Sequence, residues 1–342
     1  MTDGAHWELC AVASGSLRQQ HGTIGTVVRS GDWLATALAE PPGTGTGLIT
    51  PYRWRSIPIE KCSVSVTPDF RWAACLNYDC GEVFMADLTT GDVTPLLQSA
   101  PKSIFQVSID RAGSRVAIAE EHGSVRLVDV ASGTERTEKF EVGRYTRIAF
   151  SPTDVLAVSA MDGNKLYLCS GTDLTGTPTD LGYNSYSTYN TTWSPDGGLL
   201  FAAGRSMNPL AVQDGQVTPL PALQTNAHVQ AAVFLGADHI MVLKLGDPRC
   251  WQYDLRTGAQ EGYQAEGAAL TCLVADPASD MLAMSYGSTV HLLHPDGTNR
   301  GHIAMAHNVT DLAMSPDGYR LLVATEEKIV IYGLDSAALA AE

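Results

Sequence analysis

The sequence predicts an all-β protein that folds as a single closed β-propeller over residues 1–342. One observation is a turn of the Ser-Pro-Asp type, followed by an apolar run, which recurs at Thr67-Pro68-Asp69, Ser151-Pro152, Ser194-Pro195-Asp196-Gly197, Asp276-Pro277 and Ser315-Pro316-Asp317-Gly318. A second is the spacing of these turns, about 41 residues, which is the length of a four-stranded propeller blade. A third is the composition: 44% hydrophobic and 17% charged residues supply a core.

One repeat shows how a blade is built. Residues 145–150 form a short apolar strand, and residues 151–154 form a turn in which proline presets φ. Residues 155–160 are almost continuously apolar, which suits a strand covered on both faces by neighbouring blades. A hairpin at residues 162–164 leads into a third strand at residues 166–169. The fourth strand is short and polar, as expected of an outer edge.

A second turn recurs where the third strand ends. Its three full copies are Asp87-Leu88-Thr89-Thr90-Gly91, Asp129-Val130-Ala131-Ser132-Gly133 and Asp254-Leu255-Arg256-Thr257-Gly258. The aspartate can accept backbone N–H groups within the turn, and the glycine supplies the positive φ that closes it. We therefore expect these three aspartates to be structural.

These turns resemble the WD40-repeat family, in which a Trp-Asp pair ends the third strand and a Gly-His pair precedes the first. The matching positions hold Ala86-Asp87, Val128-Asp129 and Tyr253-Asp254, and Gly-His is present as Gly301-His302. No Trp-Asp pair occurs, so the chain is similar to a divergent member, and propellers of the lactonase-like kind share the same blade pattern. The resemblance covers nearly the whole chain and implies a scaffold whose loop-rich face docks proteins or peptides.

The N-terminal region decides the number of blades. Residues 22–60 can be placed on the same template, which predicts eight blades near 22–60, 62–98, 103–140, 144–181, 187–223, 227–264, 268–304 and 308–334. Seven blades are the alternative. The last repeat offers only three strands, and residues 6–14 are apolar and strand-like. We expect residues 6–14 to close the ring as its missing strand, because closure removes exposed strand edges.

Charge and cysteine usage exclude several function classes. The net charge of −15, with 37 acidic against 22 basic residues, disfavours nucleic-acid binding. No signal sequence is recognisable, and no apolar run approaches the roughly 18 residues that span a membrane. The seven cysteines are irregularly spaced without a CxxC pair, which favours a reducing compartment. We expect a cytoplasmic protein, and the Ala-rich, Lys-poor composition is typical of bacteria with high GC content.

No motif indicates a cofactor or a metal. The glycine-rich residues 43–47 lie between two predicted strands, whereas a phosphate-binding loop needs a helix behind it. His291 and His294 differ by three positions in a strand, so they point to opposite faces. Cys75 and Cys80 lack a second pair that would complete a tetrahedral zinc site. We therefore expect neither a bound cofactor nor a metal.

The candidate site is a tyrosine-rich loop at residues 182–190, on the face that carries the links between blades. Tyrosine, serine and asparagine are typical of adaptable binding loops. The predicted partner-binding residues are Tyr145, Tyr183, Tyr186, Tyr189, Asn190, Arg205, Asn208 and His228. The alternative is that the tyrosines only pack on neighbouring blades. Acidic residues are predicted to crowd this face and to disfavour anionic ligands: Asp79, Glu120, Glu121, Asp247, Glu326 and Glu327.

The sequence thus favours a non-catalytic scaffold for a protein or peptide partner. The alternative is a propeller enzyme or small-molecule-binding protein with its site at the mouth of the central channel. A third hypothesis makes the chain a subunit of a larger assembly. No sequence motif joins the scattered histidines and acids into a catalytic set, which favours the scaffold. The sequence does not exclude an enzyme.

Overall fold

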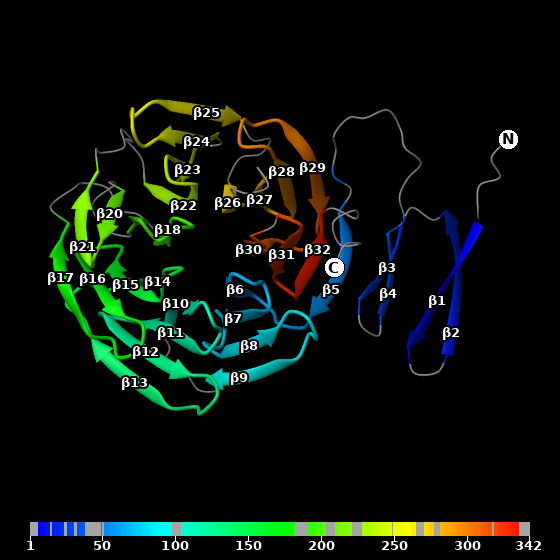
Figure 1. Ribbon diagram of the computed structural model, residues 1–342, viewed down its shortest axis with the longest axis horizontal. Coiled ribbons are helices and arrows are strands. Elements are labelled where there is room, and N and C mark those ends of the chain that lie inside the picture. Colours follow the sequence, from blue (N-terminus) through cyan, green and yellow to red (C-terminus); the bar gives the residue numbers. More distant parts are fainter. Residues whose placement is uncertain are drawn as a thin grey trace.

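Seven four-stranded antiparallel sheets surround a central axis in the computed structural model (Figure 1). The structure describes residues 6–13, 16–23, 26–30, 33–37, 49, 51–97, 104–181, 190–202, 209–220, 228–247, 249–264, 270–276, 281–316 and 318–334. The described residues form strands and turns and include no helix. Consequently, no helix in the described part of the chain could cross a membrane.

Each blade is a meander in which neighbouring strands pair in sequence order. Blades 1 to 6 are each formed by four consecutive strands. Blade 7 combines three strands from the C-terminal part of the chain with one strand that precedes blade 1. In order, the blades are β6 (Cys62–Val66), β7 (Trp72–Asn77), β8 (Val83–Asp87), β9 (Val93–Leu97); β10 (Ile104–Ile109), β11 (Arg115–Glu120), β12 (Ser124–Asp129), β13 (Glu135–Lys139); β14 (Thr146–Phe150), β15 (Val155–Ala160), β16 (Lys165–Ser170), β17 (Gly176–Asp180); β18 (Thr192–Trp193), β19 (Leu199–Phe201), β20 (Leu210–Gln213), β21 (Gln216–Pro219); β22 (Val229–Leu235), β23 (His239–Lys244), β24 (Arg249–Asp254), β25 (Gln260–Gln264); β26 (Leu270–Asp276), β27 (Met281–Tyr286), β28 (Thr289–Leu293), β29 (Asn299–Ala304); and β30 (Val309–Met314), β31 (Arg320–Thr325), β32 (Ile329–Gly333) with β5 (Tyr52–Ile57).

The ring has seven blades, so the prediction of eight was wrong. Residues 22–60, which were expected to form a first blade, are divided between separate sheets. Within them, β3 (Thr26–Ser30) pairs with β4 (Trp33–Ala37) as a two-stranded sheet. The last strand of this region, β5, joins β32 instead. The strands of residues 22–60 therefore do not form one blade, because the last of them, β5, pairs with β32 near the C-terminal end of the chain.

The closing strand also differs from the expected one. Residues 6–14 were predicted to close the ring, but β1 (His6–Ala13) pairs with β2 (Ser16–Thr23). The strand that completes blade 7 is β5, in antiparallel register from Ile329 opposite Ile57 to Gly333 opposite Tyr52. The reason lies in the blade order. Every fourth strand directly precedes the first strand of the next blade, and β5 stands in that position before β6.

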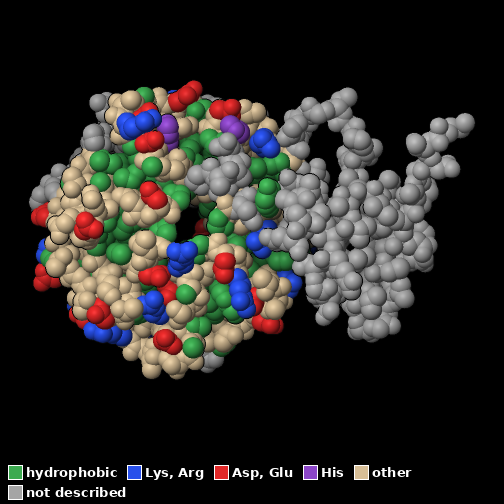
Figure 2. Space-filling view, in the orientation of Figure 1, with side chains coloured by type: hydrophobic (Ala, Val, Ile, Leu, Met, Phe, Trp, Pro, Cys, Tyr) green, Lys and Arg blue, Asp and Glu red, His purple; other side chains and the backbone are tan. Residues whose placement is uncertain are grey.

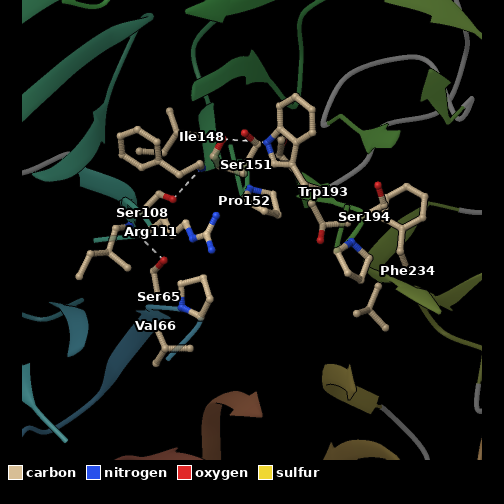
Figure 3. A pocket seen from close by; sticks show the side chains of 18 of the residues that line it. Ser65, Val66, Ser108, Arg111, Ile148, Ser151, Pro152, Trp193, Ser194 and Phe234 are labelled. Atoms are coloured by element: carbon tan, nitrogen blue, oxygen red, sulfur yellow. Dashed lines mark hydrogen bonds between the residues drawn. The ribbon is translucent and has the colours of Figure 1, made fainter. Parts of the chain in front are cut away.

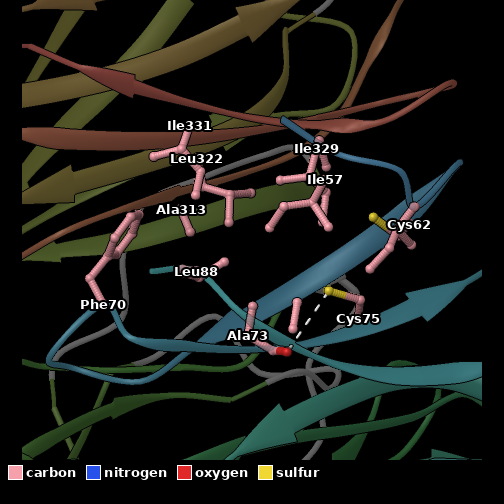
Figure 4. Close-up of a cluster of buried hydrophobic side chains, with 13 residues drawn as sticks. Ile57, Cys62, Phe70, Ala73, Cys75, Leu88, Ala313, Leu322, Ile329 and Ile331 are labelled. Atoms are coloured by element: carbon pink, nitrogen blue, oxygen red, sulfur yellow. Dashed lines mark hydrogen bonds between the residues drawn. The ribbon is translucent and has the colours of Figure 1, made fainter. Parts of the chain in front are cut away.

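Burial follows the position of a strand within its blade. The second strands are buried along most of their length, as in β11 and β31, because another blade covers each face. The outer strand β13 is exposed throughout. Where blade 7 meets blade 1, Ile57, Leu88, Leu322 and Ile331 pack into one apolar cluster, with Phe70 at its edge (Figure 4). Thus the closing strand contributes to the core as well as to the sheet.

The connections define two faces of the ring. The turn face carries the turns from first to second and from third to fourth strands, and the crossover face carries the second-to-third hairpins and the links between blades. On the turn face, Asp87 Oδ1 accepts the N–H groups of Thr89 (2.8 Å) and Thr90 (3.0 Å), while Gly91 adopts a φ of 84°. Asp254 Oδ1 accepts two N–H groups in the same way. The repeated turn therefore has the predicted hydrogen bonds.

Side chains of the inner strands tie neighbouring blades together around the channel. Ser108 Oγ on blade 2 accepts the N–H of Phe150 on blade 3 (2.9 Å). At the seam where the ring closes, Asp311 Oδ2 on blade 7 accepts the N–H of Val64 on blade 1 (2.8 Å). These bonds hold the inner strands in a fixed relative position, which gives a rigid frame to the residues at each mouth of the channel.

Candidate functional site

The described members of the predicted site lie on the crossover face. Tyr145, Asn190 and His228 come just before the inner strands of blades 3, 4 and 5. The other predicted residues lie outside the described part of the chain, namely Tyr183, Tyr186, Tyr189, Arg205 and Asn208. The tyrosine-rich loop therefore stays a prediction, and the site is built here from the residues around Tyr145.

Tyr145 belongs to a cluster of aromatic and arginine side chains, which we call the aromatic–arginine cluster: Phe105, Arg144, Tyr145 and Arg147. The rings of Phe105 and Tyr145 meet edge to face with centroids 5.5 Å apart. The Arg144 guanidinium lies over the Tyr145 ring at 5.3 Å, and that of Arg147 lies over the Phe105 ring at 5.7 Å. Such stacking holds flat side chains in place before any partner binds.

The backbone beneath this cluster is fixed by blade 2 and by a hairpin of blade 3. Glu121 forms an isolated β-bridge with Tyr145, which joins the hairpin of blade 2 to the start of blade 3. Asp162 Oδ1 accepts the N–H groups of Arg144 (3.0 Å) and Tyr145 (3.2 Å). A carboxylate that accepts two backbone N–H groups restrains both residues. The cluster therefore stands on ordered backbone although its side chains reach the surface.

Tyr78 approaches the channel from the hairpin of blade 1. It is 54% exposed, which makes it one of three large hydrophobic residues exposed in the described part of the chain. Burial of its hydroxyl and the charge of Asp311 raise the pKa of Tyr78 to about 12, against a hydrogen bond with Ser63 and the charge of Arg147. These groups belong to the inner strands of three different blades, namely Ser63 in β6, Asp311 in β30 and Arg147 in β14.

The same face continues over blades 4 and 5. Leu245 is 52% exposed, and its N–H donates to the carbonyl of His228 (2.8 Å). Beside it, Lys244 Nζ lies 3.9 Å from the centroid of the Trp251 ring, and burial lowers the pKa of this lysine. On blade 4, the buried Oδ1 of Asn190 has no hydrogen-bond partner among the described residues. This side of the face thus carries an exposed apolar residue and polar groups on neighbouring blades.

The acidic residues predicted to crowd this face are each paired with a basic or amide side chain. Acidic and basic groups are interspersed around the central hollow of the ring (Figure 2). The pairs are Lys61–Asp79 (2.7 Å), Arg126–Glu120 (2.9 Å), Arg144–Glu121 (3.3 Å), Arg249–Asp247 (3.0 Å), Asn308–Glu326 (3.3 Å) and His307–Glu327 (3.1 Å). A lysine or arginine therefore balances the charges of Asp79, Glu120, Glu121 and Asp247, which weakens the predicted repulsion of anions.

Sequence analysis identified Tyr145 but missed Phe105, Arg147 and Tyr78. Phe105 and Arg147 are partly buried and belong to inner strands, whereas the sequence analysis looked for binding residues in loops. A signal was available for Tyr78, which directly follows the second strand of blade 1 and so had to reach the crossover face. Within the described ranges, no three histidine, cysteine, aspartate or glutamate residues are grouped to hold a metal ion.

Comparisons with known proteins bear on the fold. No family model matches the sequence, and no curated protein matches it. A total of 1778 chains in solved structures match. One is a chain of "Crystal Structure of Mitotic Checkpoint Complex", with a TM-score of 0.66 and 17% identity over 91% of this chain and 99% of that chain. The fold is a WD40-like propeller. At 17% identity, this similarity shows the fold and nothing further about the protein.

Proposed function

We propose that the protein is a non-catalytic scaffold whose crossover face docks a segment of a protein partner. The observation that carries this proposal is that the exposed Tyr78 and the aromatic–arginine cluster share the crossover face. Tyrosine and arginine are enriched among the residues that dominate binding energy at interfaces. A tyrosine also offers a large contact area at a small cost in conformational entropy.

The charges at the cluster suggest the chemistry of the partner segment. Arg144 pairs with Glu121 at 3.3 Å at the surface, where such a pair contributes little free energy and can be exchanged. Arg147 lies over Phe105 on the channel side. An apolar or aromatic side chain of the partner would contact Tyr78 and Tyr145, and a neighbouring carboxylate would face the two arginines. We therefore expect an extended peptide that combines aromatic and acidic residues.

Two further observations support a protein partner. The solved chain with the same architecture comes from a complex, and propellers of this shape present rigid faces on which loops can meet a partner. The crossover face also carries the exposed Leu245, away from the cluster on blade 5, so the contact area can extend across the ring. On this proposal the chain acts as a subunit of a larger assembly.

Selection of peptides from a random phage-displayed library on the immobilised protein tests the proposal. Peptides enriched on the wild type should carry aromatic and acidic residues. Truncation of a central aromatic residue commonly costs about 2 kcal/mol or more of binding, so Tyr78→Ala with Tyr145→Ala should weaken the selected peptides at least about tenfold. Binding is measured by fluorescence anisotropy.

The matched control is Tyr319→Ala, which removes the exposed tyrosine of the turn face. This variant should bind the selected peptides like the wild type. Melting curves of all variants separate loss of binding from loss of folding. Full affinity of the double variant, or equal loss in the control, would contradict docking at the cluster.

A further inference from the structure

The proposed function leaves one feature unused, a cavity of about 340 Å³ that runs along the channel wall to the turn face. It lies between the inner strands of blades 1 to 6 and reaches the turns that follow several of them. Pro152, Trp193 and Phe234 are among its apolar walls (Figure 3). The volume falls at the lower end of the range of about 300–1,000 Å³ that is typical of small-molecule sites.

One charged side chain enters this cavity from the described part of its lining, that of Arg111. Figure 3 shows the guanidinium extending into the open space between the walls. No carboxylate stands among the described lining residues, although 37 acidic residues against 22 basic ones give the whole chain a charge of −15. The cavity therefore has the opposite sign of charge from the molecule around it.

The Arg111 backbone is anchored, whereas its side chain has no partner within the described ranges. Its N–H donates to Asp154 Oδ1 on blade 3 (3.1 Å), and Gly113 N–H donates to the Asp110 carbonyl within the same turn (3.1 Å). The guanidinium forms no hydrogen bond or ion pair within the described ranges. In contrast, Arg115 on the same turn pairs with Asp110 (2.9 Å). An anchored arginine without a carboxylate partner is prepared to bind one from a ligand.

Hydroxyl groups stand on the same wall as Arg111. Ser65 Oγ accepts the N–H of Ile109 (3.1 Å), and Ser108 Oγ accepts the N–H of Phe150 (2.9 Å). In both cases the backbone uses the oxygen as an acceptor, so the hydroxyl proton remains to be donated into the cavity. Their positions are fixed by the bonds that join the blades. The wall thus offers the guanidinium of Arg111 and the hydroxyl groups of Ser65 and Ser108 as hydrogen-bond donors.

We propose that this cavity binds the carboxylate of a small, largely apolar organic acid. The carboxylate lies against the Arg111 guanidinium near the serine hydroxyls, and the apolar body contacts the walls at Trp193 and Phe234. A single positive charge matches a monoanion, whereas a doubly charged phosphate would keep uncompensated charge among apolar walls. The carboxylate site is distinct from the docking surface because Arg111 lies in a turn on the opposite face of the ring.

Ligand-observed NMR with a series of acids from benzoate to phenylbutyrate, each compared with its primary amide, tests this site. Acid and amide share shape and apolar area, so their difference isolates the charge. The wild type should bind at least one acid about tenfold or more tightly than its amide, because a charge-assisted bidentate pair is stronger than a neutral one. Arg111→Gln should abolish the difference, and Arg111→Lys should retain part of it.

Arg256→Gln is the matched control, because Arg256 is an exposed arginine of the turn face that pairs with Asp238 (3.5 Å), outside the cavity. It should leave the preference for acids unchanged. The proposal is overturned by equal binding of acids and amides, by binding of no acid, or by the same loss in Arg256→Gln as in Arg111→Gln. Should Arg111→Gln fail to fold, the wild-type comparison and Arg111→Lys still decide the question. The peptide selection on the crossover face is independent of every one of these outcomes.

Discussion

At the scale of single residues, the repeated turns were predictable because their hydrogen bonds are local. Asp87 accepts the N–H groups two and three positions further along the chain, and Gly91 closes the turn with a positive φ. A sequence pattern contains all of that information. The inner-strand bonds could not be predicted in this way, since Asp311 and Val64 lie at opposite ends of the repeat array.

We expect Asp87→Ala to lower the free energy of unfolding by about 1–2 kcal/mol, because two turn N–H groups lose their acceptor. Asp87→Asn keeps an acceptor oxygen and should cost much less. Denaturant unfolding of both variants measures the difference. Equal destabilisation by alanine and asparagine would show that the turn depends on the charge rather than on the hydrogen bonds.

Acid should act on Asp87 in a defined direction. Burial opposes ionisation, but hydrogen bonds from Thr89 and Thr90 outweigh it and hold the pKa of Asp87 below its ordinary value of 3.8. A carboxyl whose pKa is lowered by folding stabilises the protein above its unfolded pKa. That contribution is lost as the pH falls below about 4.

Asp311 should show the opposite pH dependence. Burial raises its pKa to about 6, against the N–H groups of Val64 and Leu312. Because folding raises the pKa of Asp311, its neutral carboxyl contributes fully to stability below pH 4, and this contribution is lost as the pH rises towards 6. Relative to Asp311→Asn, the wild type should therefore lose stability between pH 4 and 7, by up to about 3 kcal/mol at about 1.4 kcal/mol per pKa unit.

Denaturant unfolding of the two proteins across this pH range measures the change for Asp311. The groups that face it are the hydroxyl of Tyr78 and the thiol of Cys75, and neither loses its proton in this interval: the pKa of Tyr78 is about 12 and that of Cys75 is well above 9. A difference between wild type and variant that does not vary with pH would contradict the assignment.

At the scale of elements, the first strands of blades 1 to 7 begin at residues 62, 104, 146, 192, 229, 270 and 309. The predicted blade starts lay near 62, 103, 144, 187, 227, 268 and 308, because a turn and an apolar run mark each of them. The closing strand carries no such mark. Both β1 and β5 are strand-like in sequence, and the choice between them depends on a partner, β32, that lies nearly the whole chain away.

Two truncated proteins distinguish closure by β1 from closure by β5. Removal of residues 1–48 retains β5 and should leave the melting temperature nearly unchanged. Removal of residues 1–60 also deletes β5, which exposes the edge of β32 and uncovers the apolar cluster around Ile57. We expect this second truncation to lower the melting temperature by about 5 °C or more in differential scanning calorimetry. An equal loss in both proteins would contradict closure by β5 alone.

At the scale of the whole molecule, ring closure brings together residues that no local pattern connects. The charges of Asp311 on blade 7 and Arg147 on blade 3 both act on the hydroxyl of Tyr78 on blade 1. Arg111 lies in a turn on the opposite face of the ring from Tyr78. The sequence indicated which face carries the links between blades and placed Tyr145 on it. It could not indicate which neighbours Tyr145 would stack against, because these come from another blade.

Hydrogen–deuterium exchange of the protein with a selected peptide tests the central claim, docking on the crossover face. The account predicts slower exchange at residues 78–82 and 143–147, which surround Tyr78 and Tyr145, with no change at the turns near residues 67–71 and 110–114. Protection confined to the turn face or to the outer strands would contradict docking at the aromatic–arginine cluster.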